Sequence, residues 1–243
     1  MRRIRLYNEQ PMSADAAVEL RGPAAHHLLK VLRRREGDQV TVFNGDGQEH
    51  QGQITAVTGR DRCTIQLNHS EQPQTESPLD ITLIQAIGRG DRMDWALQKS
   101  VELGVTAIQP VFSERTEVRL SGARAEKRLE HWRSVVISAC EQSGRVRIPE
   151  LYPLRQLAEL SADESPALFL DPEGARSLND IDLDVSRPIR LAVGPEGGFG
   201  RKDVGALKAL GFDGLRMGPR VLRTETAGPA VLAILQARAG DFT

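Results

Sequence analysis

Cysteine is scarce in this sequence, and so are long apolar stretches. Its 243 residues include two cysteines, Cys63 and Cys140, which are too far apart in sequence to form a disulfide scaffold. This usage fits a reducing compartment best. No apolar run approaches the roughly 18–20 residues that a membrane helix needs. The start, Met-Arg-Arg-Ile-Arg-Leu-Tyr, is basic but has no apolar stretch behind it, so it does not predict a secretory signal. We therefore expect a cytoplasmic protein.

Aromatic residues and metal-binding patterns are also scarce. Only 4% of the residues are aromatic, so base-stacking platforms are not expected to dominate contacts with a nucleic acid. The five histidines show no ligand spacing with cysteines or acids. We therefore expect no metal site.

Charge is nearly balanced over the chain but unevenly distributed. The formal net charge is −1, yet residues 1–35 hold eight basic residues against three acidic ones. The eight are Arg2, Arg3, Arg5, Arg21, Lys30, Arg33, Arg34 and Arg35. A basic patch on a near-neutral body fits a protein that docks on a polyanion with one face. It fits a solvated, basic helix end equally well, and charge alone does not separate these interpretations.

Residues 1–72 have the pattern of a small β-rich domain. They contain one predicted helix, residues 26–35, whose basic tail would suit the negative end of the helix dipole. Short β-branched or apolar runs and an Asn-Gly-Asp-Gly turn predict the strands. The predicted strands are residues 40–43, 53–57 and 63–67. Residues 68–78 are polar and contain two prolines, so they are the best candidate for a linker.

Residues 73–243 change to alternating strands and helices. The composition of the chain, 40% hydrophobic and 27% charged, is sufficient for a substantial core. Predicted strands are residues 81–87, 107–112, 167–170, 189–193 and 214–217. Predicted helices are residues 91–103, 124–142, 202–210 and 225–239. This alternation predicts an α/β domain with a parallel sheet covered on both faces.

Two glycine-containing loops follow predicted strands in this domain. The first is Val193-Gly194-Pro195-Glu196-Gly197-Gly198-Phe199-Gly200, which matches neither the dinucleotide fingerprint nor a phosphate loop. The second is Met217-Gly218-Pro219-Arg220-Val221-Leu222-Arg223-Thr224-Glu225-Thr226-Ala227, in which Thr224 or Thr226 can cap the next helix. Ligands bind beyond the carboxyl ends of strands in such sheets. Each loop alone can be a structural turn, but two polar loops in one sheet favour a shared binding site.

Two further motifs lie on predicted helices. Cys140 could be a nucleophile in Cys140-Glu141-Gln142-Ser143-Gly144-Arg145, but it lies on the apolar stripe of its helix, and a buried structural cysteine is the favoured interpretation. Glu141, Gln142 and Arg145 lie beyond that stripe, and Arg145 suits phosphate or carboxylate recognition. In residues 98–105, Lys99 and Glu102 can pair along the helix surface, which favours a structural role for this motif.

Taken together and in this order, the motifs resemble the bacterial small-subunit rRNA uridine-N3 methyltransferases of the SPOUT superfamily. The resemblance covers essentially the whole chain. It rests on the two loops, on the Cys140–Arg145 motif, on Glu102-Leu103-Gly104-Val105, on Ser113-Glu114-Arg115, and on amino-terminal Arg-x-Tyr and His-x-x-x-Val-Leu-Arg patterns. Departures are Gly174, where alanine is common, and Pro229 early in the last helix.

The resemblance implies a PUA-like RNA-binding β-barrel at residues 1–72 and a SPOUT α/β domain with a carboxyl-terminal trefoil knot at residues 73–243. It also implies a homodimer that acts on 16S rRNA of the small ribosomal subunit. S-adenosyl-L-methionine would bind at Leu170, Gly194, Pro195, Glu196, Gly197, Gly198, Met217, Gly218, Leu222, Arg223, Glu225 and Thr226. RNA would bind at Arg2, Arg5, Lys30, Arg33, Arg34 and Arg35.

Methyl transfer to the uracil N3 requires loss of the N3 proton and no covalent protein nucleophile. Arg145 and Arg223 are the candidate cations for stabilising the uracil anion, and Glu141 and Glu225 are the candidate proton acceptors. Two alternatives stay open at this point. One is a methyltransferase for another RNA position, and the other is a non-catalytic RNA-binding factor for ribosome assembly.

Overall fold

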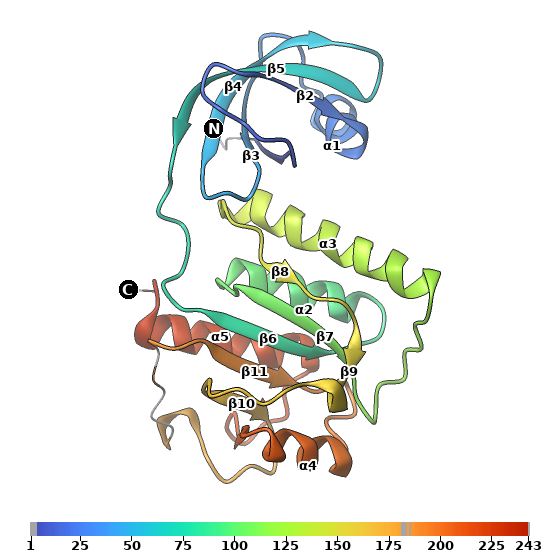
Figure 1. Cartoon of the computed structure of the whole chain (residues 1–243), viewed down its shortest axis with the longest axis vertical. Coiled ribbons are helices and arrows are strands. Elements are labelled where there is room, and N and C mark those ends of the chain that lie inside the picture. Colours follow the sequence, from blue (N-terminus) through green and yellow to red (C-terminus); the bar gives the residue numbers. More distant parts are fainter. Residues whose placement is uncertain (1–3, 181–183, 185, 243) are drawn as a thin grey trace. The chain divides into compact units, whose positions relative to one another are not determined.

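The computed structural model describes residues 4–180, 184 and 186–242, and its contacts divide the chain into two units (Figure 1). The first unit comprises Met1–Glu76 and Cys140–Ile148, and the second comprises Ser77–Ala139 and Pro149–Thr243. The sequence pattern divides the chain once, near residues 68–78. The contacts add the last turn of a long helix and the loop after it to the first unit.

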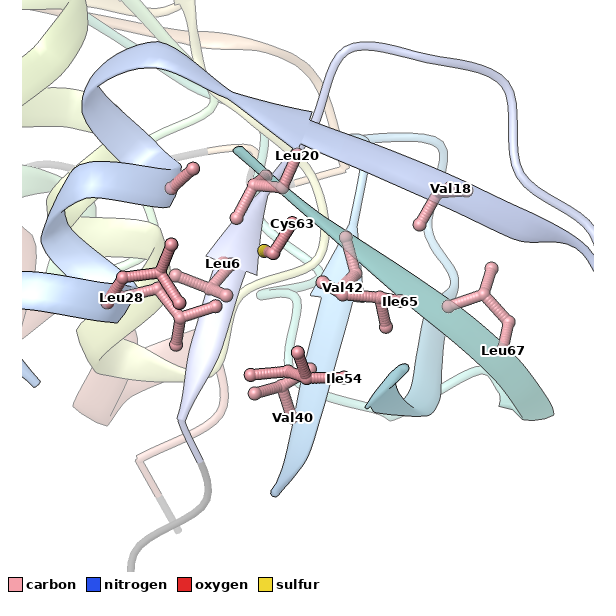
Figure 2. Close-up of a cluster of buried hydrophobic side chains, with 12 residues drawn as sticks. Leu6, Val18, Leu20, Leu28, Val40, Val42, Ile54, Cys63, Ile65 and Leu67 are labelled. Atoms are coloured by element: carbon pink, nitrogen blue, oxygen red, sulfur yellow. The ribbon is translucent and has the colours of Figure 1, made fainter. Parts of the chain in front are cut away.

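The first unit is built on a curled five-stranded sheet with the order β1-β3-β4-β5-β2. Its strands are β1 (Arg5–Tyr7), β2 (Ala17–Arg21), β3 (Gln39–Phe43), β4 (Glu49–Val57) and β5 (Arg62–Glu71). The pair β1–β3 is parallel and the other pairs are antiparallel. Every second side chain points inward, as in Cys63, Ile65 and Leu67 of β5, because strand side chains alternate between faces. Figure 2 shows these side chains converging with Leu28 in one core.

The helix predicted at residues 26–35 begins and ends four residues earlier than expected, and its second half is wider. A helical turn, α1 (Gly22–His26), continues into a π-helical turn, η1 (His27–Val31). The Leu32 N–H donates to the His27 carbonyl at 2.9 Å, and Arg33 then takes a positive φ of 54°. The helix therefore ends before the arginines, so the helix dipole does not account for them. The apolar pattern was misleading because Val31 is 60% exposed whereas Leu28 is fully buried.

The second unit contains a seven-stranded sheet in which every strand pair is parallel, as predicted. The strand order is β12-β10-β11-β6-β7-β8, and β9 also pairs with β7. The strands are β6 (Ile81–Ala86), β7 (Ala107–Phe112), β8 (Glu150–Leu151), β9 (Arg155–Gln156), β10 (Ala167–Leu170), β11 (Ile189–Val193) and β12 (Asp213–Leu215). The two-residue strands β8 and β9 are too short to give a periodic signal and were not predicted.

Helices cover both faces of this sheet, as predicted. They are α2 (Asp91–Glu102), α3 (Ala123–Ser143), α4 (Arg201–Ala209) and α5 (Thr224–Ala239), with 3₁₀ turns η2 (Leu157–Glu159) and η3 (Leu178–Asp180). Gly228 of α5 lies against Leu83 and Val193, whereas Leu207 of α4 packs with Ile84 and Ala192. Because neighbouring strand residues point to opposite faces, α5 and α4 lie on opposite sides of the sheet.

Two features are absent from the described residues. No helix in this part of the chain is long and apolar enough to span a membrane. No group of three or more His, Cys, Asp or Glu side chains among the described residues is arranged to hold a metal ion.

We predict that Leu28→Ala destabilises the protein far more than Val31→Ala. Removing the buried leucine should lower the free energy of unfolding by about 2–5 kcal/mol. The exposed valine should change it by about 0.5 kcal/mol or less. Chemical denaturation followed by far-UV circular dichroism measures both. Similar losses for the two variants would mean that Val31 is buried, as a regular helix through residue 35 would require.

Candidate active site

A cavity of about 320 Å³ lies at the carboxyl ends of the neighbouring strands β10, β11 and β12 in the second unit. Its volume is in the range of small-molecule sites, and its position is the usual one for ligands of parallel sheets. The lining residues are Arg92, Leu170, Asp171, Pro172, Val193, Gly194, Pro195, Glu196, Gly198, Leu215, Met217, Gly218, Arg220, Val221, Leu222, Arg223, Thr224, Glu225 and Ala227. The two glycine loops of the sequence thus meet at one cavity.

The loop after β11 is a tight turn that favours glycine at two positions. A Cβ atom on Gly194 would lie 3.0 Å from the Phe199 nitrogen, so a side chain there would push the backbone apart. Gly198 has a φ of +67°, and its N–H donates to the Pro195 carbonyl at 2.9 Å. Glycine at these positions leaves bare backbone beside the cavity, which allows a ligand to approach the main chain closely.

Glu196 ties this loop to the loop after β6. Its Oε1 accepts hydrogen bonds from the Arg89 N–H and from the Arg92 Nη1, both at 2.9 Å. Partial burial by itself would raise the pKa of the Glu196 carboxyl. The hydrogen bonds from the Arg89 and Glu196 backbone and from the Arg92 guanidinium outweigh this effect and lower the pKa below its usual value. Glu196 is therefore a carboxylate at neutral pH.

The Ser113-Glu114-Arg115 motif holds the same loop from another side. Arg115 Nη1 donates to the Gly197 carbonyl at 2.7 Å. The Glu114 N–H donates to the Asp203 carboxylate at 3.0 Å, and the same carboxylate accepts from the Gly200 N–H at 2.9 Å. The motif therefore positions the glycine loop, a role that the sequence did not reveal.

Thr224 connects the two cavity loops through its hydroxyl. Thr224 Oγ1 donates to the Gly194 carbonyl at 2.6 Å and accepts from Gln85 Nε2 at 3.0 Å. Both side chains are buried. The prediction that Thr224 or Thr226 caps α5 was wrong, because the N-cap is Arg223 and no side-chain cap forms. Gln85 was missed because it is a single amide within an apolar strand.

Arg223 and Glu225 place opposite charges at the cavity. Arg223 is exposed, and its guanidinium makes no hydrogen bond or ion pair with any residue that the structure describes. Glu225 lies in the first turn of α5, and its Oε2 is buried without a hydrogen-bond partner among the described residues. The site thus offers an available cation beside a carboxylate whose Oε2 is enclosed by the protein.

Most of the residues predicted to bind the cofactor come together here. Ten of them line the cavity: Leu170, Gly194, Pro195, Glu196, Gly198, Met217, Gly218, Leu222, Arg223 and Glu225. Gly197 and Thr226 do not line it. Gly197 faces the Arg115 side chain, and Thr226 lines a second cavity on the same unit.

Arg145 belongs to the first unit and is engaged there. It is 4% exposed, and its Nε and Nη2 donate to Glu76 Oε2 at 2.9 Å and 2.8 Å. The backbone N–H groups of Val146 and Arg147 donate to the other oxygen of Glu76. These contacts neutralise the guanidinium and favour a structural role.

Glu141 is similarly engaged, because its Oε1 accepts from the Tyr7 N–H at 3.0 Å. Burial raises the pKa of the Glu141 carboxyl, against the opposing effects of the Tyr7 hydrogen bond and of the His27 and Arg5 charges. Burial also raises the pKa of the Cys140 thiol to about 12. Cys140 is therefore a neutral thiol, in agreement with its interpretation as a structural residue.

Arg5 differs from the expectation of an RNA contact. Its guanidinium donates to Glu49 Oε2 at 2.9 Å, to the Cys140 carbonyl at 2.8 Å and to the Arg145 carbonyl at 3.0 Å, and it stacks over the Phe43 ring. All three guanidinium nitrogens therefore serve the first unit itself, because each donates to one of these oxygens.

The remaining predicted RNA contacts gather on one surface of the first unit. Lys30, Arg33, Arg34 and Arg35 line a groove of about 590 Å³, together with Glu36 and a few apolar residues. The Arg34 Nε is buried without a hydrogen-bond partner in the described part of the chain. We call the groove that these four cations line the basic groove. Arg2 lies outside the described residues.

We predict that Thr224→Val lowers the free energy of unfolding by about 1–3 kcal/mol, because the buried Gly194 carbonyl loses the hydroxyl and Gln85 Nε2 keeps only its bond to the Ala86 carbonyl. Thr224→Ser keeps the hydroxyl and should cost about 0.8 kcal/mol for the lost methyl group. Thermal or chemical denaturation distinguishes the variants. Equal losses for Val and Ser would mean that the hydroxyl does not hold the loops together.

Comparison with known proteins identifies both units. A family model for an RNA methyltransferase domain matches residues 75–236, and one for an RNA methyltransferase PUA domain matches residues 20–68. The ribosomal RNA small subunit methyltransferase E of Buchnera aphidicola (from Schizaphis graminum) is 32% identical over 98% of each chain.

Solved structures agree over the whole chain. The ribosomal RNA small subunit methyltransferase E of Neisseria gonorrhoeae, bound to S-adenosyl methionine, is 42% identical with a TM-score of 0.90, and each chain is fully covered. A Legionella pneumophila protein with bound cofactor SAM is 37% identical with a TM-score of 0.95, again over both full chains. The chain therefore belongs to the RNA methyltransferase family that includes ribosomal RNA small subunit methyltransferase E.

Proposed function

We propose that this protein transfers a methyl group from S-adenosyl-L-methionine to the N3 of a uridine in 16S rRNA of the small ribosomal subunit. One observation carries the proposal: two glycine loops, far apart in sequence, form a single cavity at the carboxyl ends of β10, β11 and β12. Relatives that are 37% and 42% identical were solved with this cofactor.

The residues of the cavity fit S-adenosyl-L-methionine. Leu170, Val193 and Leu215 offer an apolar wall that suits the adenine ring, and the backbone at Gly194 and Gly218 can be approached closely. The Glu196 carboxylate suits a ribose hydroxyl or the cationic groups of the cofactor. When bound, the cofactor supplies a methyl group on a positively charged sulfur.

Arg223 and Glu225 are the residues best placed for the chemistry. In the transfer, N3 of uracil loses its proton and forms a bond to the methyl carbon, while the electron pair of the broken carbon–sulfur bond stays on sulfur. Glu225, which lines the cavity, accepts the N3 proton, and Arg223 stabilises the negative charge that develops on the uracil oxygens. Arg145 and Glu141 keep structural roles in this proposal, because their charged groups already have partners in the first unit.

The basic groove of the first unit binds the RNA backbone. Three of its four cations are exposed, and cations on one face of a near-neutral protein suit a ribose-phosphate chain. Two further features remain predictions from the resemblance, the trefoil knot and the homodimer. The mass of the protein in solution, measured by light scattering, tests the second.

The activity is tested with purified small ribosomal subunits and a labelled methyl donor. We expect label in 3-methyluridine after digestion of the RNA, identified by mass spectrometry. Arg223→Ala should lower kcat by about 10²–10³, as for loss of one group that stabilises an oxyanion. Label in a different nucleoside would reject the uridine N3. Calorimetry that detects no binding of S-adenosyl-L-methionine would instead point to a non-catalytic RNA-binding factor.

Loss of two cations from the basic groove should weaken RNA binding without affecting the cofactor. For Arg33→Ala combined with Arg34→Ala, we predict that the slope of log K against log salt concentration falls by about 1–2, one unit for each lost phosphate contact. Affinity measurements at several salt concentrations test this. The matched control is calorimetry with S-adenosyl-L-methionine, whose affinity should stay the same. A parallel loss of cofactor binding would mean that these arginines support the structure instead.

A further inference from the structure

A second cavity of about 650 Å³ adjoins the first on the second unit, between α2 and the start of α5. It is lined by Asp91, Arg92, Trp95, Lys99, Arg223, Glu225, Thr226, Pro229 and Ala230. Arg92, Arg223 and Glu225 also line the first cavity, so the two cavities share a wall. We call this second space the α2–α5 cavity. A molecule in it would lie beside Glu225, proposed to accept the N3 proton, and Arg223, proposed to stabilise the uracil anion.

Trp95 gives this cavity an aromatic surface. Its side chain is 57% exposed, whereas the other tryptophan, Trp132, is buried. The Lys99 ammonium lies 5.4 Å from the centre of the Trp95 ring. Aromatic side chains beside cations are the usual platform for unpaired nucleobases, because every base offers a flat face for stacking. The low aromatic content of the chain makes such a platform unexpected from the composition alone.

Polar and charged groups surround this aromatic surface. Arg92 is paired with Glu196, and Lys99 with Glu102, so Arg223 is the cation of this cavity without a carboxylate partner among the described residues. Glu225 supplies a carboxylate at the wall that the two cavities share. Six of the nine lining residues are charged or polar. The central part of a protein–protein interface is depleted in charged residues, which argues against a second copy of the chain as the occupant.

We propose that the α2–α5 cavity receives the acceptor nucleotide, a pyrimidine unstacked from its RNA strand, with its base against Trp95. This inference rests on the proposed function. The base then presents its Watson–Crick edge, which carries N3, to Glu225 and Arg223 at the shared wall. Enzymes that act on a base commonly take it out of its stack and hold it between apolar side chains in this way. Trp95 is thus a substrate-binding residue that positions N3 towards the first cavity.

The test compares Trp95→Leu with Trp95→Phe. A base–aromatic stack is worth about 1–3 kcal/mol, and each 1.4 kcal/mol is a factor of ten. Trp95→Leu should therefore raise the KM for RNA by roughly 5- to 150-fold, with an unchanged Kd for S-adenosyl-L-methionine. Trp95→Phe keeps a ring and should stay close to the unaltered protein. Ile234→Ala removes another exposed apolar side chain of α5, outside both cavities, and should change neither constant.

A second measurement does not need methyl transfer. Titration with a short uridine oligonucleotide should quench the fluorescence of Trp95 but not that of the buried Trp132, and the Trp95→Phe variant should lose the quench. Quenching in a protein that transfers no methyl group would reject the proposed function and leave the base site standing.

Any of three results would reject the proposal that a base binds at Trp95. They are no quenching, an unchanged KM for RNA in Trp95→Leu, and a loss of activity that follows dissociation of an oligomer. The last result would assign Trp95 to contacts between copies of the chain. Light scattering on each variant reports it directly.

Discussion

The hydrogen bond of 2.6 Å from the Thr224 hydroxyl to the Gly194 carbonyl is the constraint on which the site depends. It joins the first turn of α5 to the loop after β11. The same hydroxyl accepts a hydrogen bond from the side-chain amide of Gln85 on β6. Without it, the two glycine loops would be independent turns at the edge of a sheet. With it, the carbonyl, the hydroxyl and the amide form one buried unit, and the cavity has fixed walls.

The sequence was most informative where the structure is locally determined. Glycine and polar residues after buried strands marked both loops correctly, because these residue types are needed wherever the backbone turns closely. A residue whose hydrogen-bond partner lies far away in the sequence leaves no such pattern. Glu76 lies in residues 68–78, which the polar, proline-containing sequence predicted to be a linker. Its carboxylate nevertheless pairs with Arg145, 69 residues away. Gln85 is hidden in the same way, since one amide in an apolar strand does not disturb the strand pattern.

The basic residues of the amino-terminal part show why charge counts alone could not assign roles. Arg5 and Arg33 contributed equally to the local excess of positive charge. Arg5 lies on β1, and its three guanidinium nitrogens donate to the Glu49 carboxylate and to the carbonyls of Cys140 and Arg145. Arg33 follows an early helix end at a positive φ and stays exposed. The π-helical turn η1 ends at Val31, so Arg33 lies beyond the helix.

The cations considered for catalysis and substrate binding also differ in whether a carboxylate lies beside them. An arginine that already faces a carboxylate contributes little field to a new negative charge, because the pair is neutral as seen from a distance. Arg145 has Glu76, Arg92 has Glu196, and Lys99 has Glu102. Arg223 has no such partner among the described residues, and it borders both cavities of the second unit. In the proposed reaction, a negative charge that forms on a base between those cavities is therefore stabilised most strongly at Arg223.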